Sequence, residues 1–247
     1  MTRTASGSLP LRDRLPRPRA VLFDLFHTLV SVPKPGGDAG PSLAEALGIP
    51  HAHAELQRRY HEEDILGRCI GSVRDPREIL KTLAHGLDPS ISEERITRAL
   101  ATRRRRFERG LVAVEPKFLA ALDRLRSAGI RTALVSDAGY DDVEAWPRSP
   151  LRDRLDVTVF SCDLGVRKPD RRIYEHALGR LGIGGRDALF VGDGGSDEHR
   201  GARALELGTV LVTRLLAYAD PNAVAARRAH VDWEFADVAE FADALLA

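Results

Sequence analysis

The sequence has few cysteines and no recognisable cysteine motif. Its 247 residues contain only Cys69 and Cys162, which lie far apart and in no metal-binding spacing. This argues against a disulfide framework and against a cysteine-based zinc site. We expect each cysteine to be a small buried residue in a reducing compartment rather than a reactive thiol.

Long apolar runs are also lacking. No segment approaches the roughly 20 consecutive apolar residues that a membrane-spanning helix needs. Residues 1–19 contain Arg, Pro, Ser and Gly without the apolar run of a signal peptide, so we expect a flexible tail there. The sequence therefore predicts a cytoplasmic protein with no membrane partner.

An excess of charge of one sign is missing as well. The 37 basic and 36 acidic residues give a net charge of +1, which argues against nucleic acid or another polyanion as a general partner. Only four basic residues are lysines, at positions 34, 81, 117 and 168, so a scattered arginine carries little weight. The four consecutive arginines at 103–106 fall in a helical stretch, and we interpret them as a solvated face ahead of an anion site.

Apolar runs alternate with amphipathic segments from about residue 113 onward, which predicts a parallel sheet flanked by helices. A first strand ends at Asp24, and we expect further strands at 132–136, 157–161, 188–192 and 209–213. Each strand ends in a polar or glycine-containing turn. In parallel α/β folds these turns are where ligands bind.

The region from about 33 to 112 differs because it has no convincing strand. It begins in a Pro/Gly-rich linker and continues with helical stretches near 42–48, 52–69, 76–86 and 92–108. We interpret it as an all-helical insertion. The predicted organisation is a tail at 1–19, an α/β core formed by 20–32 and 113–247, and a helical cap at 33–112.

A glycine-rich turn with two carboxylates follows the predicted strand at 188–192. Asp193 and Asp197 lie four residues apart, and such a pair can converge on Mg²⁺, a cation that takes oxygen ligands. The alternative is a capped turn in which Asp197 is the N-cap of the next helix. The motif alone leaves both readings open.

Two further strand ends carry groups suited to a phosphate. Lys168 stands beside Pro169 in a turn, where a compact ammonium fits a phosphate and a nearby carboxylate; the alternative is a surface turn residue. Ser136, followed by Asp137, offers a hydroxyl and backbone N–H groups, although Ser-Asp is common in turns.

Together these motifs, in this order and each at a strand end, resemble the haloacid dehalogenase (HAD) superfamily of hydrolases over residues 20–246. The order is Asp24, then Ser136, then Lys168, then the Asp193/Asp197 turn. The resemblance implies a Rossmann-like three-layer α/β/α core with a parallel sheet. It also implies that the helical insertion is a type 1 cap.

The resemblance implies a phosphatase in which Asp24 attacks phosphorus and forms an aspartyl-phosphate. Mg²⁺ would be held by Asp24, by the backbone carbonyl of Phe26 and by Asp193, with Asp197 as a ligand or as its support. Catalysis would rest on Asp24 with two groups that position and neutralise the phosphoryl oxygens, Ser136 and Lys168. The implied substrate-binding residues are His27, Thr28, Ser136, Asp137 and Lys168.

Phe26 departs from the family pattern, because phosphatases of this family carry a second Asp there for proton transfer. General acid–base assistance is worth about 10² to 10⁴ in rate. The first account is a Mg²⁺-dependent phosphatase of a small phosphorylated metabolite. Either its substrate has a good leaving group that needs less acid help, or His27 supplies the proton.

Two other accounts stay open. A 2-haloacid dehalogenase also has an aromatic residue at the position of Phe26 and needs no metal, but it would not keep the Asp193/Asp197 pair. A third account is a HAD-fold protein that binds a phosphorylated ligand with little or no turnover, which the otherwise intact motif set opposes. The sequence identifies neither the substrate nor the oligomeric state.

Overall fold

The computed structural model describes residues 15–64, 66–219 and 223–247, and within them six parallel strands form one sheet. The strand order is β3-β2-β1-β4-β5-β6. The strands are β1 (Ala20–Phe23), β2 (Arg131–Ser136), β3 (Val157–Phe160), β4 (Ala188–Gly192), β5 (Gly208–Val212) and β6 (Trp233–Phe235). The predicted parallel α/β fold is confirmed, and β6 is a short strand that the sequence pattern did not reveal.

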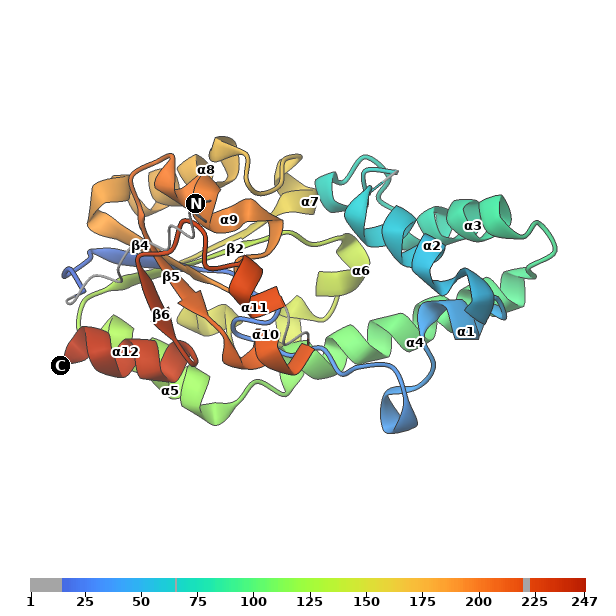
Figure 1. The fold of residues 1–247 in the computed structure, drawn as a ribbon, viewed down its shortest axis with the longest axis horizontal. Coiled ribbons are helices and arrows are strands. Elements are labelled where there is room, and N and C mark those ends of the chain that lie inside the picture. Colours follow the sequence, from blue (N-terminus) through green and yellow to red (C-terminus); the bar gives the residue numbers. More distant parts are fainter. Residues whose placement is uncertain (1–14, 65, 220–222) are drawn as a thin grey trace, which may run out of the picture.

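Helices cover both faces of the sheet, giving three layers (Figure 1). Helices α5 (Pro116–Ser127) and α12 (Val238–Leu246) pack on one face, and α8 (Arg171–Leu181) and α9 (Glu198–Arg203) on the other. Along β1, Val21 and Phe23 join the first apolar core while Ala20 and Leu22 join the second. This alternation follows from the period of two in a strand, and it makes β1 apolar at every position.

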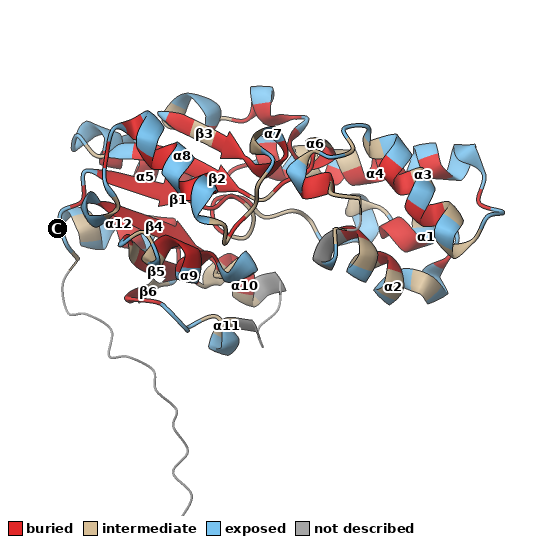
Figure 2. Ribbon diagram, turned by 90° about the horizontal axis from the view of Figure 1, so that it is seen from above, coloured by how far each residue is buried: buried red, intermediate tan, exposed pale blue. Residues whose placement is uncertain are grey.

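A second group of helices lies beyond the sheet, to the right in Figure 1. It contains α1 (Leu43–Leu47), α2 (His53–Gln57), α3 (Pro76–Leu87) and α4 (Glu93–Val112). These helices bury an apolar cluster of their own, which Figure 2 shows as buried faces turned toward one another. Side-chain caps start α3 and α4, the two longest helices of this group: Asp75 accepts from the Arg77 N–H and Ser92 from the Arg95 N–H.

The single helix expected at 52–69 is wrong. Helix α2 ends at Gln57, one π-helical turn follows at Arg58–Glu62, and Gly67 has a φ of 60° before a short 3-10 turn at Arg68–Ile70. A positive φ breaks the helix, and glycine adopts it at little cost. The helix therefore ends well before residue 69.

Two chain segments join the helical part to the sheet. One runs from Asp24 to the 3-10 turn η1 (Gly37–Ala39), and the other is the C-terminal end of α4. They touch at Gly110, where an added Cβ would lie 3.0 Å from the Ser31 carbonyl oxygen. In the described residues no helix is long and apolar enough to cross a membrane. Residues 1–14 of the expected tail lie outside the described residues.

Candidate active site

The central strands bring the motif residues to one edge of the sheet. Asp24 directly follows β1, and its backbone N–H donates to the Val191 carbonyl at 2.9 Å, continuing the pairing with β4. Phe23 is in register with Leu134 of β2 and Val191 of β4. Asp24 therefore lies between the strand that ends in Ser136 and the strand that leads to Asp193.

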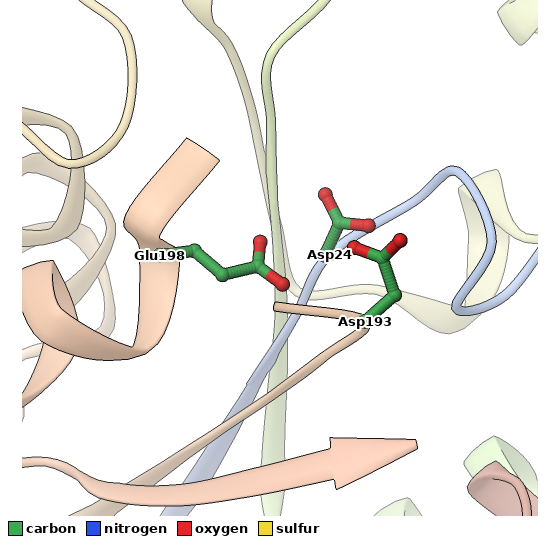
Figure 3. A group of neighbouring side chains, drawn as sticks. All are labelled: Asp24, Asp193 and Glu198. Atoms are coloured by element: carbon green, nitrogen blue, oxygen red, sulfur yellow. The ribbon is translucent and has the colours of Figure 1, made fainter. Parts of the chain in front are cut away.

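Three carboxylates converge at this edge. One oxygen from each of Asp24, Asp193 and Glu198 lies within 4.8 Å of the others, and all three residues are buried. Figure 3 shows the side chains approaching from three segments, the ends of β1 and β4 and the start of α9. Like charges at this spacing repel strongly out of water, so the group is suited to binding a cation.

Asp197 does not join this group, contrary to its expected place beside Asp193. Its side chain is 70% exposed and pairs with Arg200 at 3.1 Å, whereas Glu198 is fully buried. Glu198 begins α9 and shares its buried face with Gly201 and Ala202. Residues three and four apart lie on one face of a helix, and this spacing is the signal in the sequence that points to Glu198.

Lys168 is held between two of the carboxylates. Its Nζ donates to Asp24 Oδ1 at 2.5 Å and to Glu198 Oε2 at 2.6 Å, and the side chain is buried. Burial alone would lower the pKa of Lys168, but the Asp24 and Glu198 carboxylates outweigh it and raise that pKa well above its usual range. The ammonium is therefore charged and oriented toward Asp24.

Asp137 orders the Lys168 turn. Its Oδ1 accepts the Lys168 backbone N–H at 2.9 Å, so this carboxylate holds the turn through the main chain. Its Oδ2 is buried with no hydrogen-bond partner in the described part of the chain.

Two hydroxyls flank Asp24. Thr28 Oγ1 donates to Asp24 Oδ2 at 3.0 Å, which fixes the rotation of that carboxylate. Ser136 is fully buried, and its Oγ has no hydrogen-bond partner within the described residues. A buried hydroxyl without a partner is costly, so Ser136 is suited to donate to an oxygen of a bound substrate.

The loop after Asp24 carries Phe26 and His27. The Phe26 ring meets the Phe107 ring of α4 edge-on at 5.3 Å, so this side chain links the loop to the helical part. His27 has a φ of 63° and donates its backbone N–H to the Val30 carbonyl at 2.8 Å. Its Nδ1 is buried without a hydrogen-bond partner among the described residues.

Arg227 also reaches the site, and no sequence motif marks it. Its Nη1 donates to Asp193 Oδ2 at 2.5 Å and to the Asp193 carbonyl at 3.2 Å. It follows the short helix α11 (Ala223–Ala226). We call this set of three carboxylates and two cations the site cluster: Asp24, Lys168, Asp193, Glu198 and Arg227.

A second set of buried charges joins the helical part to the sheet-bearing part. Arg103 Nε donates to Asp141 at 2.6 Å, and the Tyr60 hydroxyl donates to the same carboxylate oxygen at 2.8 Å. Both Arg103 and Arg68 also donate to Asp142, on α6 (Tyr140–Val143). We call these the interface cluster: Tyr60, Arg68, Arg103, Asp141 and Asp142.

The arginine run at 103–106 is therefore not a uniformly solvated face as expected. Arg103 and Arg106 are 3% and 7% exposed, while Arg105 is exposed. Positions 103 and 106 are three apart and lie on one side of α4. The helix turns that side toward the rest of the protein.

Known proteins resemble this chain over most of its length. The model of the haloacid dehalogenase-like hydrolase family matches residues 18–204. The (S)-2-haloacid dehalogenase 4A of Burkholderia cepacia is 27% identical over 213 residues, covering 79% of this chain and 83% of that protein. The glyceraldehyde 3-phosphate phosphatase of Methanopyrus kandleri is 26% identical over 203 residues, covering 79% and 84%.

Solved structures agree on the fold. The L-2-haloacid dehalogenase from Xanthobacter autotrophicus superposes with a TM-score of 0.59 at 17% identity, covering 93% of this chain and 98% of that one. At this identity the likeness concerns the fold alone. The relatives thus include dehalogenases and phosphatases.

Proposed function

Because this chain belongs to the haloacid dehalogenase-like hydrolase family, we propose that it is a Mg²⁺-dependent phosphatase acting on a small phosphorylated metabolite. The observation that carries the proposal is the convergence of three buried carboxylates, Asp24, Asp193 and Glu198. Attack on carbon by one aspartate has no use for two more carboxylates. A phosphoryl group and a divalent cation give all three a role.

The donor set fits Mg²⁺. Carboxylate oxygens are the ligands that this ion prefers in proteins, commonly completed by water and substrate phosphate. We propose Asp24, Asp193 and Glu198 as its protein ligands, with the Phe26 carbonyl as a fourth and without Asp197. When bound, Mg²⁺ would neutralise charge on the phosphoryl oxygens and stabilise the negative transition state.

The chain's own residues supply the nucleophile and its alignment. Thr28 holds one Asp24 oxygen and Lys168 the other, so the carboxylate is fixed in orientation before substrate binds. An Asp24 oxygen attacks phosphorus, the bond to the leaving oxygen breaks, and an aspartyl-phosphate forms. Water then attacks that phosphorus, releasing phosphate and regenerating Asp24. Ser136 and Lys168 bind the phosphoryl oxygens throughout.

Phe26 determines which substrates turn over. With no carboxylic acid at this position, the leaving oxygen departs without that group's proton, so we propose that phosphoesters of acidic alcohols react fastest. His27, which follows Phe26 directly in the sequence, is the titratable side chain that would replace the missing proton donor. We propose that the helical part at 33–112 acts as the cap that selects the leaving group, since Phe107 of α4 already contacts Phe26.

A second candidate is hydrolysis of a 2-haloacid. In this reaction an Asp24 oxygen attacks the carbon that bears the halogen, halide leaves, and water hydrolyses the resulting ester. Two observations favour it: the aromatic side chain at Phe26, and the pairing of Asp193 with Arg227, which partly offsets the negative charge without a metal. The Burkholderia cepacia relative carries a dehalogenase name.

One experiment separates the candidates. Phosphate release from aryl and alkyl phosphomonoesters is measured with Mg²⁺ and with EDTA, beside chloride release from (S)-2-chloropropionate. We expect Mg²⁺-dependent phosphate release, faster for aryl esters, that Asp24→Asn lowers by at least about 10³-fold. Asp197→Asn, which changes an exposed carboxylate four residues from Asp193, is the matched control and should keep its rate.

Two outcomes contradict the phosphatase. Chloride release that is unaffected by EDTA supports the dehalogenase instead. Absence of both activities, with Mg²⁺ or a phosphorylated compound still raising the melting temperature, supports a protein that binds without turnover. Phe26→Asp, with Phe26→Asn as its uncharged control, tests the missing acid: the Asp variant alone should accelerate release from alkyl esters.

A further inference from the structure

A pocket of about 250 Å³ lies between η1 and the C-terminal half of α4. Its walls are the chain from Asp38 to Pro41 on one side and four residues of α4 on the other, Thr102, Arg105, Arg106 and Arg109. None of these residues belongs to the site cluster or to the interface cluster. The pocket lies where the two segments that connect the helical part to the sheet come together.

The α4 wall is a stripe of positive charge. Positions 102, 105, 106 and 109 are spaced three and four apart, which places them on one helical face. Within the described residues, Arg109 donates to the Asp38 carbonyl oxygen alone, at 2.8 Å, and Arg105 to the Thr102 hydroxyl alone, at 3.0 Å. Among the described residues, no carboxylate pairs with either guanidinium.

Arg106 is the most unusual of the three. It is only 7% exposed, and its Nε has no hydrogen-bond partner within the described part of the chain. Burial lowers the pKa of Arg106, and the charge of the adjacent Arg103 adds to this effect. Guanidinium stays protonated in proteins, so Arg106 carries a buried charge that no carboxylate of the described chain offsets. Such a charge is costly unless a partner arrives.

We propose that this pocket binds a phosphate group, held by Arg106 at its base and by Arg105 and Arg109 at its rim. Guanidinium groups present paired N–H donors that match phosphate oxygens, and the volume admits a phosphate with a small substituent. Asp38 is the one acidic residue in the lining, and it is exposed at the rim. A bound phosphate would connect η1 with α4 and thereby join the two linkers of the helical part.

The test measures the arginine Nε–H resonances of the full chain by NMR. In protein labelled with ¹⁵N-arginine, inorganic phosphate is titrated at constant ionic strength, with chloride as the balancing salt. The Nε–H resonances of Arg106 and Arg109 should shift with a saturable curve, and each is assigned by the loss of its signal in Arg106→Gln or Arg109→Gln. Methylphosphonate, which has no hydrolysable ester, distinguishes a site for substituted phosphates from one for the free ion.

Three variants sharpen the result. Arg106→Gln should weaken phosphate affinity, followed at Arg109, by about tenfold or more. Asp38→Asn removes the only carboxylate of the lining and should tighten binding. Arg95→Gln removes an exposed charge of α4 outside the pocket and should leave binding unchanged. If Arg106→Gln fails to fold, Arg109→Gln, at an exposed position, gives the same comparison through the Arg106 signal.

The proposal is overturned if chloride alone produces the same shifts, or if the Arg109 signal titrates identically in Arg106→Gln. It does not depend on the proposed phosphatase activity. Phosphate bound at the site cluster would leave the Arg106 and Arg109 resonances of the wild type unshifted, and its binding would survive Arg106→Gln, so failure of one proposal is distinguishable from failure of the other.

Discussion

The site cluster and the interface cluster both bury several charges, but they differ in charge balance. The interface cluster sets two arginines against two aspartates, and Tyr60 adds a hydrogen bond to Asp141. The site cluster sets three carboxylates against Lys168 and Arg227, and Arg227 is 30% exposed. One set is neutral by its own composition. The other has one more carboxylate than it has cations, and burial beside Asp24 and Asp193 raises the pKa of Glu198 well above its usual range.

This difference separates a structural role from a functional one. Buried charges are tolerated when their partners are in place, and removing one partner leaves the other uncompensated. The interface cluster therefore joins two parts of the protein without needing a ligand. The site cluster has a third carboxylate without a cation of its own at the end of the sheet, where ligands bind in α/β folds.

The largest stability effect is expected in the balanced cluster. Asp142→Asn removes one of two carboxylates facing Arg68 and Arg103, and we expect it to lower the free energy of unfolding by about 3–5 kcal/mol. Urea denaturation measures this loss. Glu144→Gln is the control, because Glu144 pairs with Arg104 at the surface and such pairs contribute about 0–1 kcal/mol. Equal losses in the two variants would contradict the assignment.

Mg²⁺ should stabilise the protein through the unbalanced cluster. A ligand that binds only the folded state at 100 times its dissociation constant adds about 2.7 kcal/mol to the free energy of unfolding. We expect this gain in the wild type and its loss in Asp193→Asn, measured by urea denaturation with Mg²⁺ or EDTA. An undiminished gain in Asp193→Asn would place the ion elsewhere, and no gain in the wild type would favour the metal-free candidate.

Much of the fold follows from the sequence because its signals are local. The apolar strands, the polar strand ends and the helical stretches each lie in a short window, so the sequence predicts Asp24, Ser136 and Lys168 at strand ends or turns, where the structure also has them. Three features depend on contacts between distant segments: the role of Arg227, the burial of Arg103 and the short strand β6. Their partners lie 34 or more residues away along the chain in the first two cases, and no local pattern marks them.

Neutralising the nucleophile should cost little stability, unlike neutralising Asp142. Asp24→Asn removes one of the three carboxylates and still presents an oxygen beside Lys168. In EDTA we expect its free energy of unfolding to be unchanged or raised by up to about 1 kcal/mol. Residues kept for activity are often not the most stabilising ones at their positions. A loss comparable to that in Asp142→Asn, measured in the same urea titration, would mean that the two clusters do not differ as described.

The smallest effect concerns the neighbours Asp197 and Glu198, which the sequence does not distinguish by residue type alone. Asp197 is exposed and, in the described part of the chain, pairs with Arg200 alone. Asp197→Asn should therefore change the free energy of unfolding by less than about 0.5 kcal/mol and keep the Mg²⁺ response. Glu198→Gln removes a buried carboxylate that accepts from Lys168 and from the Gly194 N–H. It should weaken the Mg²⁺ response, because an amide replaces one of the three carboxylate ligands proposed for the ion. If Asp197→Asn weakened the Mg²⁺ response and Glu198→Gln kept it, α9 would be rotated about its axis from the orientation described, and Asp197 would face the metal.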